Sequence, residues 1–330
     1  MWHHLLMPPF LITVKISINY PKIVNFYPKE NSVIISSRGV TMDNKLNNII
    51  NEFFENTDAK NDEELNNQLQ ELMEKYNNGE IDYVNTAMDD AYELLEEAQN
   101  TKSKKKAKKL AEEAYLGCPD CFDALLYMVE LEDSYIKKLE LLEEGLEFEK
   151  DKLEEEKYFE KDNIGHFYGI FETRPYMRGL YTKANIFIEM GKIKQARDIC
   201  KEILKLNKND NLGARYLLMA IYAFLEDEKE MLALYKKYPE EHLQMLFPLF
   251  ALYYKNSNDE KAIEYLKRIN KSNPNFIKLF KGKMEDNENI MPGYYSIGDS
   301  SEIKMYFMNY TFLLLTLPLI DEYILKYSKK

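Results

Sequence analysis

The feature that most constrains the fold is a recurring helical pattern of small and apolar residues, bounded by residues that break helices. The pattern comprises Ala107, Ala111 and Ala114; Ala196, Cys200 and Ile203; and Ala262, Leu266 and Ile269. Positions three or four apart share one helix face, and small side chains there allow a second helix to pack closely. Gly191 precedes the second stretch, and Pro119 and Pro274 follow the first and third, where a proline ends a helix. The sequence therefore predicts an all-α fold built from helix pairs.

This pattern resembles the tetratricopeptide repeat (TPR), a helix–turn–helix unit of roughly 34 residues. Units are predicted at 88–121, 122–157, 177–210, 211–242 and 243–276. The third is the clearest, because 191–196 matches the family's turn, although Lys208 stands where the family usually has proline. Lys138 and Glu230 occupy small-residue positions, so the second and fourth units are expected to be irregular. The resemblance implies a right-handed α-solenoid of about five TPR-like helix pairs.

Two further segments sharpen the resemblance. The sequence GHFYGIFETRPYMR at 165–178 and the sequence PGYYS at 292–296 are similar to features of a bacterial TPR group of unassigned function. They add no chemistry of their own.

The N-terminal part of the chain is expected to differ from the rest. Residues 1–41 contain the only tryptophan and lack a helical period, and Pro8 and Pro9 interrupt their apolar run, which disfavours a signal peptide. The run Ser-Arg-Gly-Val-Thr-Met at 37–42 could be a translated ribosome-binding site. We therefore expect 1–41 to be a non-native or disordered extension, with Met42 as the native start.

The remaining chain divides into three predicted parts. An N-terminal helical hairpin spans 42–80, in which Asp62 could cap the second helix, and the TPR solenoid spans 81–290. A capping segment at 291–330 ends the chain. Its hydrophobic stretch 305–320 is shorter than the roughly 20 apolar residues of a membrane span and is interrupted by polar residues. A final helix sealing the end of the solenoid is the favoured interpretation.

Charge and cysteine content exclude several classes of protein. The formal net charge is −12, and a surface of that sign repels phosphate backbones, so a nucleic-acid partner is not expected. Three cysteines cannot form a disulfide framework in 330 residues, which favours a reducing cytoplasm.

Motifs for catalysis, metals or cofactors are not found. The chain has no P-loop, no G-x-G-x-x-G and no H-E-x-x-H. Cys118 and Cys121 form a C-x-x-C, but its proline already ends a repeat, so a structural role is favoured over redox or zinc chemistry. His166 and His242 have no orienting acid identifiable from the sequence. We expect no enzyme activity, cofactor, catalytic residue or metal site.

A partner surface can be transferred from the family's groove positions on the first helix of each pair. These positions hold Arg178, Tyr181 and Asn185; Arg215, Met219 and Tyr222; and Phe247, Ala251 and Tyr254, with Arg174 beside them. Three of the six arginines thus fall on or near this surface, and arginine grips carboxylates bidentately. An acidic or C-terminal peptide segment is the predicted ligand, unless these arginines pair with local carboxylates instead.

The favoured function is a protein–protein interaction scaffold or adaptor with a peptide-binding groove. One alternative is an enzyme or enzyme subunit with a site at 166–178, which requires His166 and Glu172 to converge in a polar pocket. Another is a membrane-associated assembly factor anchored by 305–320, although a membrane role is not favoured.

Overall fold

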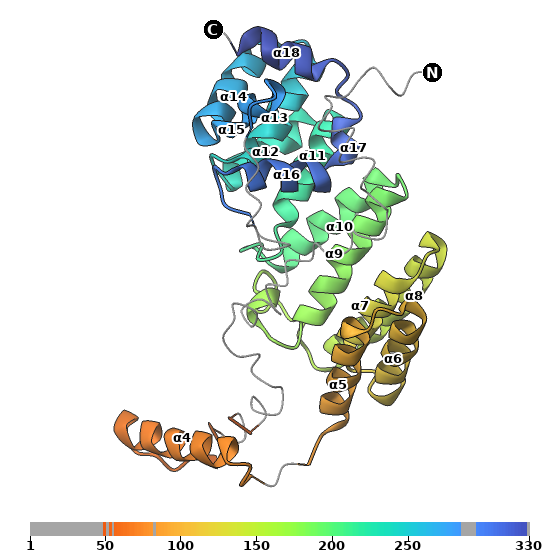
Figure 1. Cartoon of the computed structure of the whole chain (residues 1–330), viewed down its shortest axis with the longest axis vertical. Coiled ribbons are helices and arrows are strands. Elements are labelled where there is room, and N and C mark those ends of the chain that lie inside the picture. The colour runs from red at the N-terminus through yellow and green to blue at the C-terminus, as the bar shows by residue number, and fades with distance from the viewer. Residues whose placement is uncertain (1–48, 51–52, 55, 82–83, 285–294, 329–330) are drawn as a thin grey trace. The chain divides into compact units, whose positions relative to one another are not determined.

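The chain is all-α in the part that the structure describes (Figure 1). This computed structural model describes residues 49–50, 53–54, 56–81, 84–284 and 295–328. Within these residues no strand forms, and the only β-type pairing consists of isolated bridges from Asn207 to Gly165 and His166. The predicted extension 1–41, the Met42 start and the residues Pro292, Gly293 and Tyr294 lie outside the described residues.

The helices follow one another closely along the chain. The first group is α4 (Asp62–Asn77), α5 (Ala87–Asn100), α6 (Lys104–Gly117), α7 (Phe122–Leu131) and α8 (Tyr135–Glu155). A short 3₁₀ turn, η2 (Phe167–Gly169), precedes α9 (Arg174–Glu189), α10 (Ile193–Leu206), α11 (Ala214–Leu225), α12 (Glu228–Lys237), α13 (Leu243–Lys255) and α14 (Asp259–Ser272). The last helices are α15 (Asn275–Phe280), α16 (Ser300–Asn309), α17 (Thr311–Leu314) and α18 (Ile320–Tyr327). Each of the five predicted repeat ranges thus corresponds to two consecutive helices.

The small residues named from the sequence lie where helices touch. Ala111, Ala196 and Ala262 are each 0% exposed, on α6, α10 and α14 respectively. The turn between α9 and α10 depends on Gly191, whose φ of +72° is a backbone conformation that residues with a Cβ rarely adopt. Small buried side chains let neighbouring helices pack closely, and the glycine turn lets α9 and α10 form a pair.

Contacts divide the described residues into two compact units, and the division falls inside α8, between Gly145 and Leu146. In the first unit α5 packs on α6, and α7 packs on both. Gly145 makes close packing of α8 possible, because a Cβ there would lie 2.0 Å from a methyl carbon of Leu125. Tyr127 reaches across to α5 and donates its hydroxyl to the carbonyl of Ala98.

In the second unit α9 packs on α10, α10 on α11, and α11 on both α12 and α13. Helix α13 is the centre of this unit, since every residue from Leu243 to Tyr253 is buried. Its Phe247 ring lies 5.0 Å from the ring of Tyr306 and 5.8 Å from that of Phe307, both on α16. Burying an aromatic side chain of this kind stabilises a fold by roughly 1.5–3 kcal/mol.

A buried carboxylate fastens α16 to α13 and α14. Glu302 is 0% exposed, and its Oε1 accepts the backbone N–H of Leu243 at 2.9 Å, in the first turn of α13. Its Oε2 accepts from the Asn273 amide at 2.8 Å and from the Gly298 N–H at 2.9 Å. A carboxylate at a helix N-terminus meets N–H groups that have no partner inside the helix, so Glu302 also caps α13.

Two local predictions are corrected. Asn61, rather than Asp62, caps α4, because its side chain accepts from the N–H of Glu64 at 2.9 Å. In its described residues, 295–328, the C-terminal segment forms three short helices rather than one capping helix. Pro318 has no N–H to continue a helix, and Leu319 follows with a φ of +60°, so the chain turns sharply before α18.

No helix in the described part of the chain has the length and apolar character needed to cross a membrane. The stretch 305–320 is divided between α16, α17, the turn that follows α17, and the first residue of α18.

Candidate functional site

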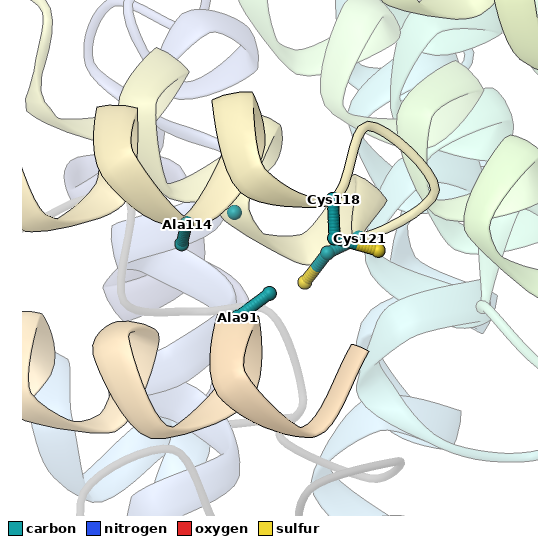
Figure 2. Packing of buried hydrophobic residues seen from close by; sticks show 5 residues of the cluster. Ala91, Ala114, Cys118 and Cys121 are labelled. Atoms are coloured by element: carbon teal, nitrogen blue, oxygen red, sulfur yellow. The ribbon is translucent and has the colours of Figure 1, made fainter. Parts of the chain in front are cut away.

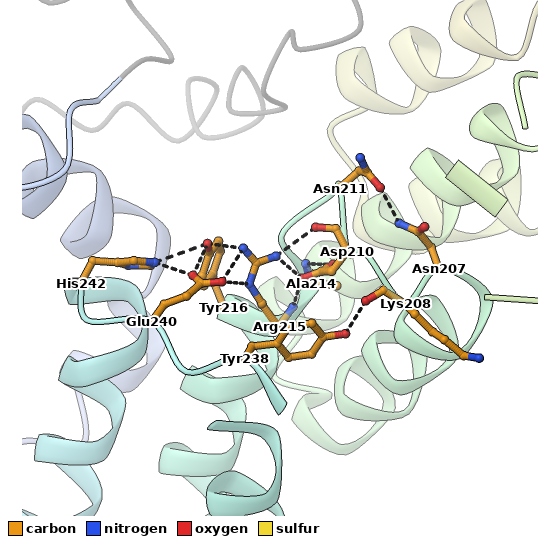
Figure 3. Close-up of polar contacts among 10 residues, drawn as sticks. All are labelled: Asn207, Lys208, Asp210, Asn211, Ala214, Arg215, Tyr216, Tyr238, Glu240 and His242. Atoms are coloured by element: carbon orange, nitrogen blue, oxygen red, sulfur yellow. Dashed lines mark hydrogen bonds and ion pairs between the residues drawn. The ribbon is translucent and has the colours of Figure 1, made fainter. Parts of the chain in front are cut away.

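A polar cluster forms where α10 turns into α11. We call Asp210, Arg215, Tyr216, Glu240 and His242 the Arg215 cluster (Figure 3). At one end of the cluster, the Asp210 carboxylate accepts hydrogen bonds from the backbone N–H groups of Ala214 at 2.8 Å and Arg215 at 2.9 Å. Asp210 is 2% exposed and therefore acts as an internal cap for α11.

Arg215 connects the cap to the loop between α12 and α13. Its Nη1 lies 2.9 Å from Asp210 Oδ2, and its Nη2 lies 3.0 Å from Glu240 Oε1. The guanidinium also stacks 4.1 Å from the ring centroid of Tyr216 and donates to the Tyr216 hydroxyl. With 14% of the side chain exposed, Arg215 is largely committed to carboxylates of its own chain.

Glu240 and His242 complete the row seen in Figure 3, which runs from His242 through Glu240, Tyr216 and Arg215 to Asp210. His242 Nε2 lies 2.6 Å from Glu240 Oε2, and the Tyr216 hydroxyl donates to the same oxygen at 2.8 Å. Burial disfavours the Glu240 charge, but the hydrogen bonds from Tyr216 and His242 and the Arg215 charge together lower the pKa of Glu240. Burial, followed by the bond to Glu240, raises the pKa of Tyr216.

The acid beside His242 went unrecognised in the sequence. Glu240 precedes His242 by two positions, and residues two apart lie on the same side of an extended backbone, which was the available signal. The pair has the form of an acid–histidine dyad whose histidine is buried, with 8% of His242 and 31% of the Glu240 side chain exposed. The Arg215 cluster is best suited to fixing the α12–α13 loop against α11.

The predicted partner positions on α9 are only partly buried. Arg174, Arg178, Tyr181 and Asn185 follow one another at intervals of four, three and four residues, which places them on one face of α9. All four are half-buried. We call these four residues the α9 stripe.

Arg174 is the arginine of this stripe whose contacts are best defined. Its Nε donates to the carbonyl of Tyr168 at 3.0 Å, and its guanidinium lies 5.5 Å from the Tyr168 ring centroid and 5.4 Å from that of Phe171. In the described part of the chain it pairs with no carboxylate. The sequence left open whether these arginines pair with carboxylates of their own chain. Arg215 does so, whereas Arg174 stacks on aromatic rings.

The predicted groove residues on α11 and α13 other than Arg215 are mostly buried. Met219, Tyr222 and Phe247 are 0%, 3% and 1% exposed, and Ala251 is 0% exposed. Tyr254 is half-buried and donates its hydroxyl to the carbonyl of Pro318. In this conformation these five positions support the fold, and a partner could reach only Tyr254 among them without a rearrangement.

The turn in the connector 166–178 is held by hydrogen bonds from a side chain to the backbone. The Thr173 hydroxyl donates to the carbonyl of Phe167 and, at 3.0 Å, to that of Ile170, which holds the turn before α9. His166 and Glu172 are both exposed. The buried polar pocket that an enzyme site would require here is therefore not built by these two residues.

Cys118 and Cys121 lie in a small apolar core with Ala91, Ala114 and Ala124 (Figure 2). They are 7% and 1% exposed and form no disulfide. Figure 2 shows Ala91 of α5 pointing toward the turn that holds both cysteines. Among the described residues no group of histidine, cysteine or acidic side chains could hold a metal ion.

No family model matches the chain, and a search of curated proteins finds no match.

Proposed function

We propose that this chain is a TPR-like interaction scaffold that holds a segment of another protein. Its sequence resembles that of a bacterial TPR group of unassigned function. The observation that supports this most is the order of helix contacts. Helices pack in consecutive pairs, α5 with α6, α9 with α10, α11 with α12 and α13 with α14. Neighbouring pairs meet through α10 with α11 and α11 with α13, as stacked repeats do.

The α9 stripe is the proposed partner surface. It combines two arginines, a tyrosine and an asparagine on one helix face, each partly accessible to solvent. Arginine and tyrosine dominate the binding energy of many protein interfaces, and arginine selects carboxylates. The ligand we propose is therefore an acidic or C-terminal peptide segment lying along α9. Cysteines without disulfides are compatible with a cytoplasmic location, which forms part of the proposal.

Charge reversal on α9 tests this function. The full chain and its Arg174→Glu variant would be presented to a displayed library of C-terminal peptides from the source organism's proteins. We expect wild type to retain acidic peptides and Arg174→Glu to weaken them about tenfold or more, since losing a charged interface contact costs several kcal/mol. Direct titration of each retained peptide measures the loss.

Arg197→Glu is the matched control. Arg197 lies on α10, in the same helix pair, and pairs with the adjacent Asp198 at 2.8 Å. This variant should retain the peptides. Equal retention by all three proteins would move binding away from α9, and the absence of any retained peptide would refute the proposed peptide-binding function. Thermal unfolding of each variant confirms that the fold persists.

A further inference from the structure

The C-terminal helix α18 occupies a face that contains the predicted partner position Tyr254. The Tyr323 ring lies 5.0 Å from the ring of Tyr254 and 6.2 Å from that of Phe250. The Tyr323 hydroxyl donates to Asp259 Oδ1 at 2.9 Å, and the Tyr327 hydroxyl donates to Asp259 Oδ2 at 3.2 Å. We call Phe250, Tyr254 and Asp259 the α18 seat. One exposed carboxylate thus binds two tyrosines four residues apart on one helix face.

α18 is held differently from the other C-terminal helices. Ile324 is its only buried residue, whereas α16 is anchored by six buried residues that include Glu302. An eight-residue helix is marginal by itself in water, so α18 depends for its structure on the seat and on α15, against which it also packs. Its polar contacts lie at the surface and are open to competition.

The connection to α18 favours opening at a defined point. Leu319 has a φ of +60°, a strained conformation for a residue with a branched side chain. Leu315 and Leu319 are 62% and 50% exposed on either side of Pro318. Strain and exposed apolar side chains are concentrated in this short turn between α17 and α18, whereas α16, which lies before α17 in the chain, is firmly anchored.

We propose that the α18 seat is a docking site for a partner's amphipathic helix with aromatic hydroxyls four residues apart, and that α18 is the internal occupant which such a helix displaces. This inference rests on the proposed scaffold function and adds a second contact to the α9 stripe. The partner's chemistry follows from the seat itself. Phe250 and Tyr254 offer aromatic surface, and Asp259 accepts two hydroxyl donors.

A peptide with the sequence of residues 316–328, labelled with a fluorophore, provides the probe. Full-length wild type should bind it weakly, because its own α18 fills the seat. Tyr323→Ala loosens α18 and leaves the seat intact, so it should bind the peptide about tenfold more tightly, in proportion to the fraction of open seats. Glu322→Gln, at an exposed position of the same helix, should behave as wild type.

Adding Tyr254→Ala to Tyr323→Ala removes the seat and should abolish the gain. Equal affinity for wild type and Tyr323→Ala, or binding that survives Tyr254→Ala, would overturn the proposal. Hydrogen exchange on wild type gives a readout without mutation. The α18 amides should exchange faster than those of α13 and α16 through local opening, and exchange only with global unfolding would also overturn it.

These outcomes are separable from those of the α9 test. The 316–328 peptide could bind the Tyr323→Ala variant while wild type retains no acidic peptide. That result would support the docking site and refute the peptide-binding function proposed for α9. Retention of acidic peptides with no release of α18 would do the opposite.

Discussion

Arg215 illustrates how one side chain can be assigned two roles until its neighbours are known. From the sequence it occupies a partner position, and arginine there predicts an acidic ligand. In the structure the acids are Asp210 and Glu240 of the same chain, at 2.9 and 3.0 Å. The sequence could not resolve this, because Glu240 lies 25 positions away and its approach depends on how α12 returns to α11.

Replacement of Arg215 should therefore act on stability. Arg215→Met leaves the buried Asp210 carboxylate and Glu240 without their common cation. We expect a loss of about 2–3 kcal/mol in unfolding free energy, because hydrogen bonds to charged groups contribute ~1.5–3 kcal/mol each. Urea denaturation measures it. Arg197→Met, which removes a pair between adjacent residues on one helix, should change stability by less than ~0.5 kcal/mol. Similar midpoints for Arg215→Met and wild type would show that the cluster is not stabilising.

At the scale of helices, helix ends could be predicted best where a proline follows closely in the sequence. α6 ends at Gly117, two residues before Pro119, and α14 ends at Ser272, two residues before Pro274. The C-terminal segment was predicted less well, because its hydrophobicity suggested one helix and its partition depends on the turn at Leu319. The burial of Phe247 was also not predicted, since its ring packs against Tyr306 and Phe307 of α16, about 60 residues later in the chain.

The end of α7 allows a test of electrostatics between helices. Glu132 follows α7 and accepts from Lys108 of α6 at 2.9 Å, as well as from the backbone N–H groups of Ser134 and Asp133. The Lys108 hydrogen bond first, and then the Ser134 and Asp133 bonds, lower the pKa of Glu132 from 4.5 to about 2. A carboxyl group with a depressed pKa stabilises the fold above its ordinary pKa, and this stabilisation is lost as the pH falls toward about 2.

Glu132→Gln should therefore be less stable than wild type at about pH 6, and the difference should shrink progressively below pH 4.5. Denaturant midpoints for both proteins between about pH 6 and about pH 2 provide the measurement. Glu113→Gln, which removes a solvent-exposed pair with Lys109, serves as the control. A difference between Glu132→Gln and wild type that stays constant across this range would rule out the Lys108 pair as its origin.

At the scale of the whole molecule, the basic run 102–109 is largely paired with nearby acids. Six lysines occur within 102–109, which by itself is typical of a nucleic-acid patch. Four of them pair within this unit: Lys104 with Asp133, Lys106 with Glu97, Lys108 with Glu132 and Lys109 with Glu113. The overall charge of −12 opposes any remaining attraction to phosphate.

We accordingly expect the full chain to bind neither a labelled single-stranded RNA nor a duplex DNA at about 0.15 M salt, where non-specific binders typically have Kd values of ~10⁻⁴–10⁻⁶ M. Fluorescence anisotropy at several salt concentrations measures this directly. The triple variant Glu97→Gln/Glu132→Gln/Asp133→Asn removes three of the paired acids and should raise low-salt binding, because the lysines then face phosphate without competition. Salt-dependent binding by wild type that equals that of the triple variant would mean that these ion pairs do not neutralise the lysine run.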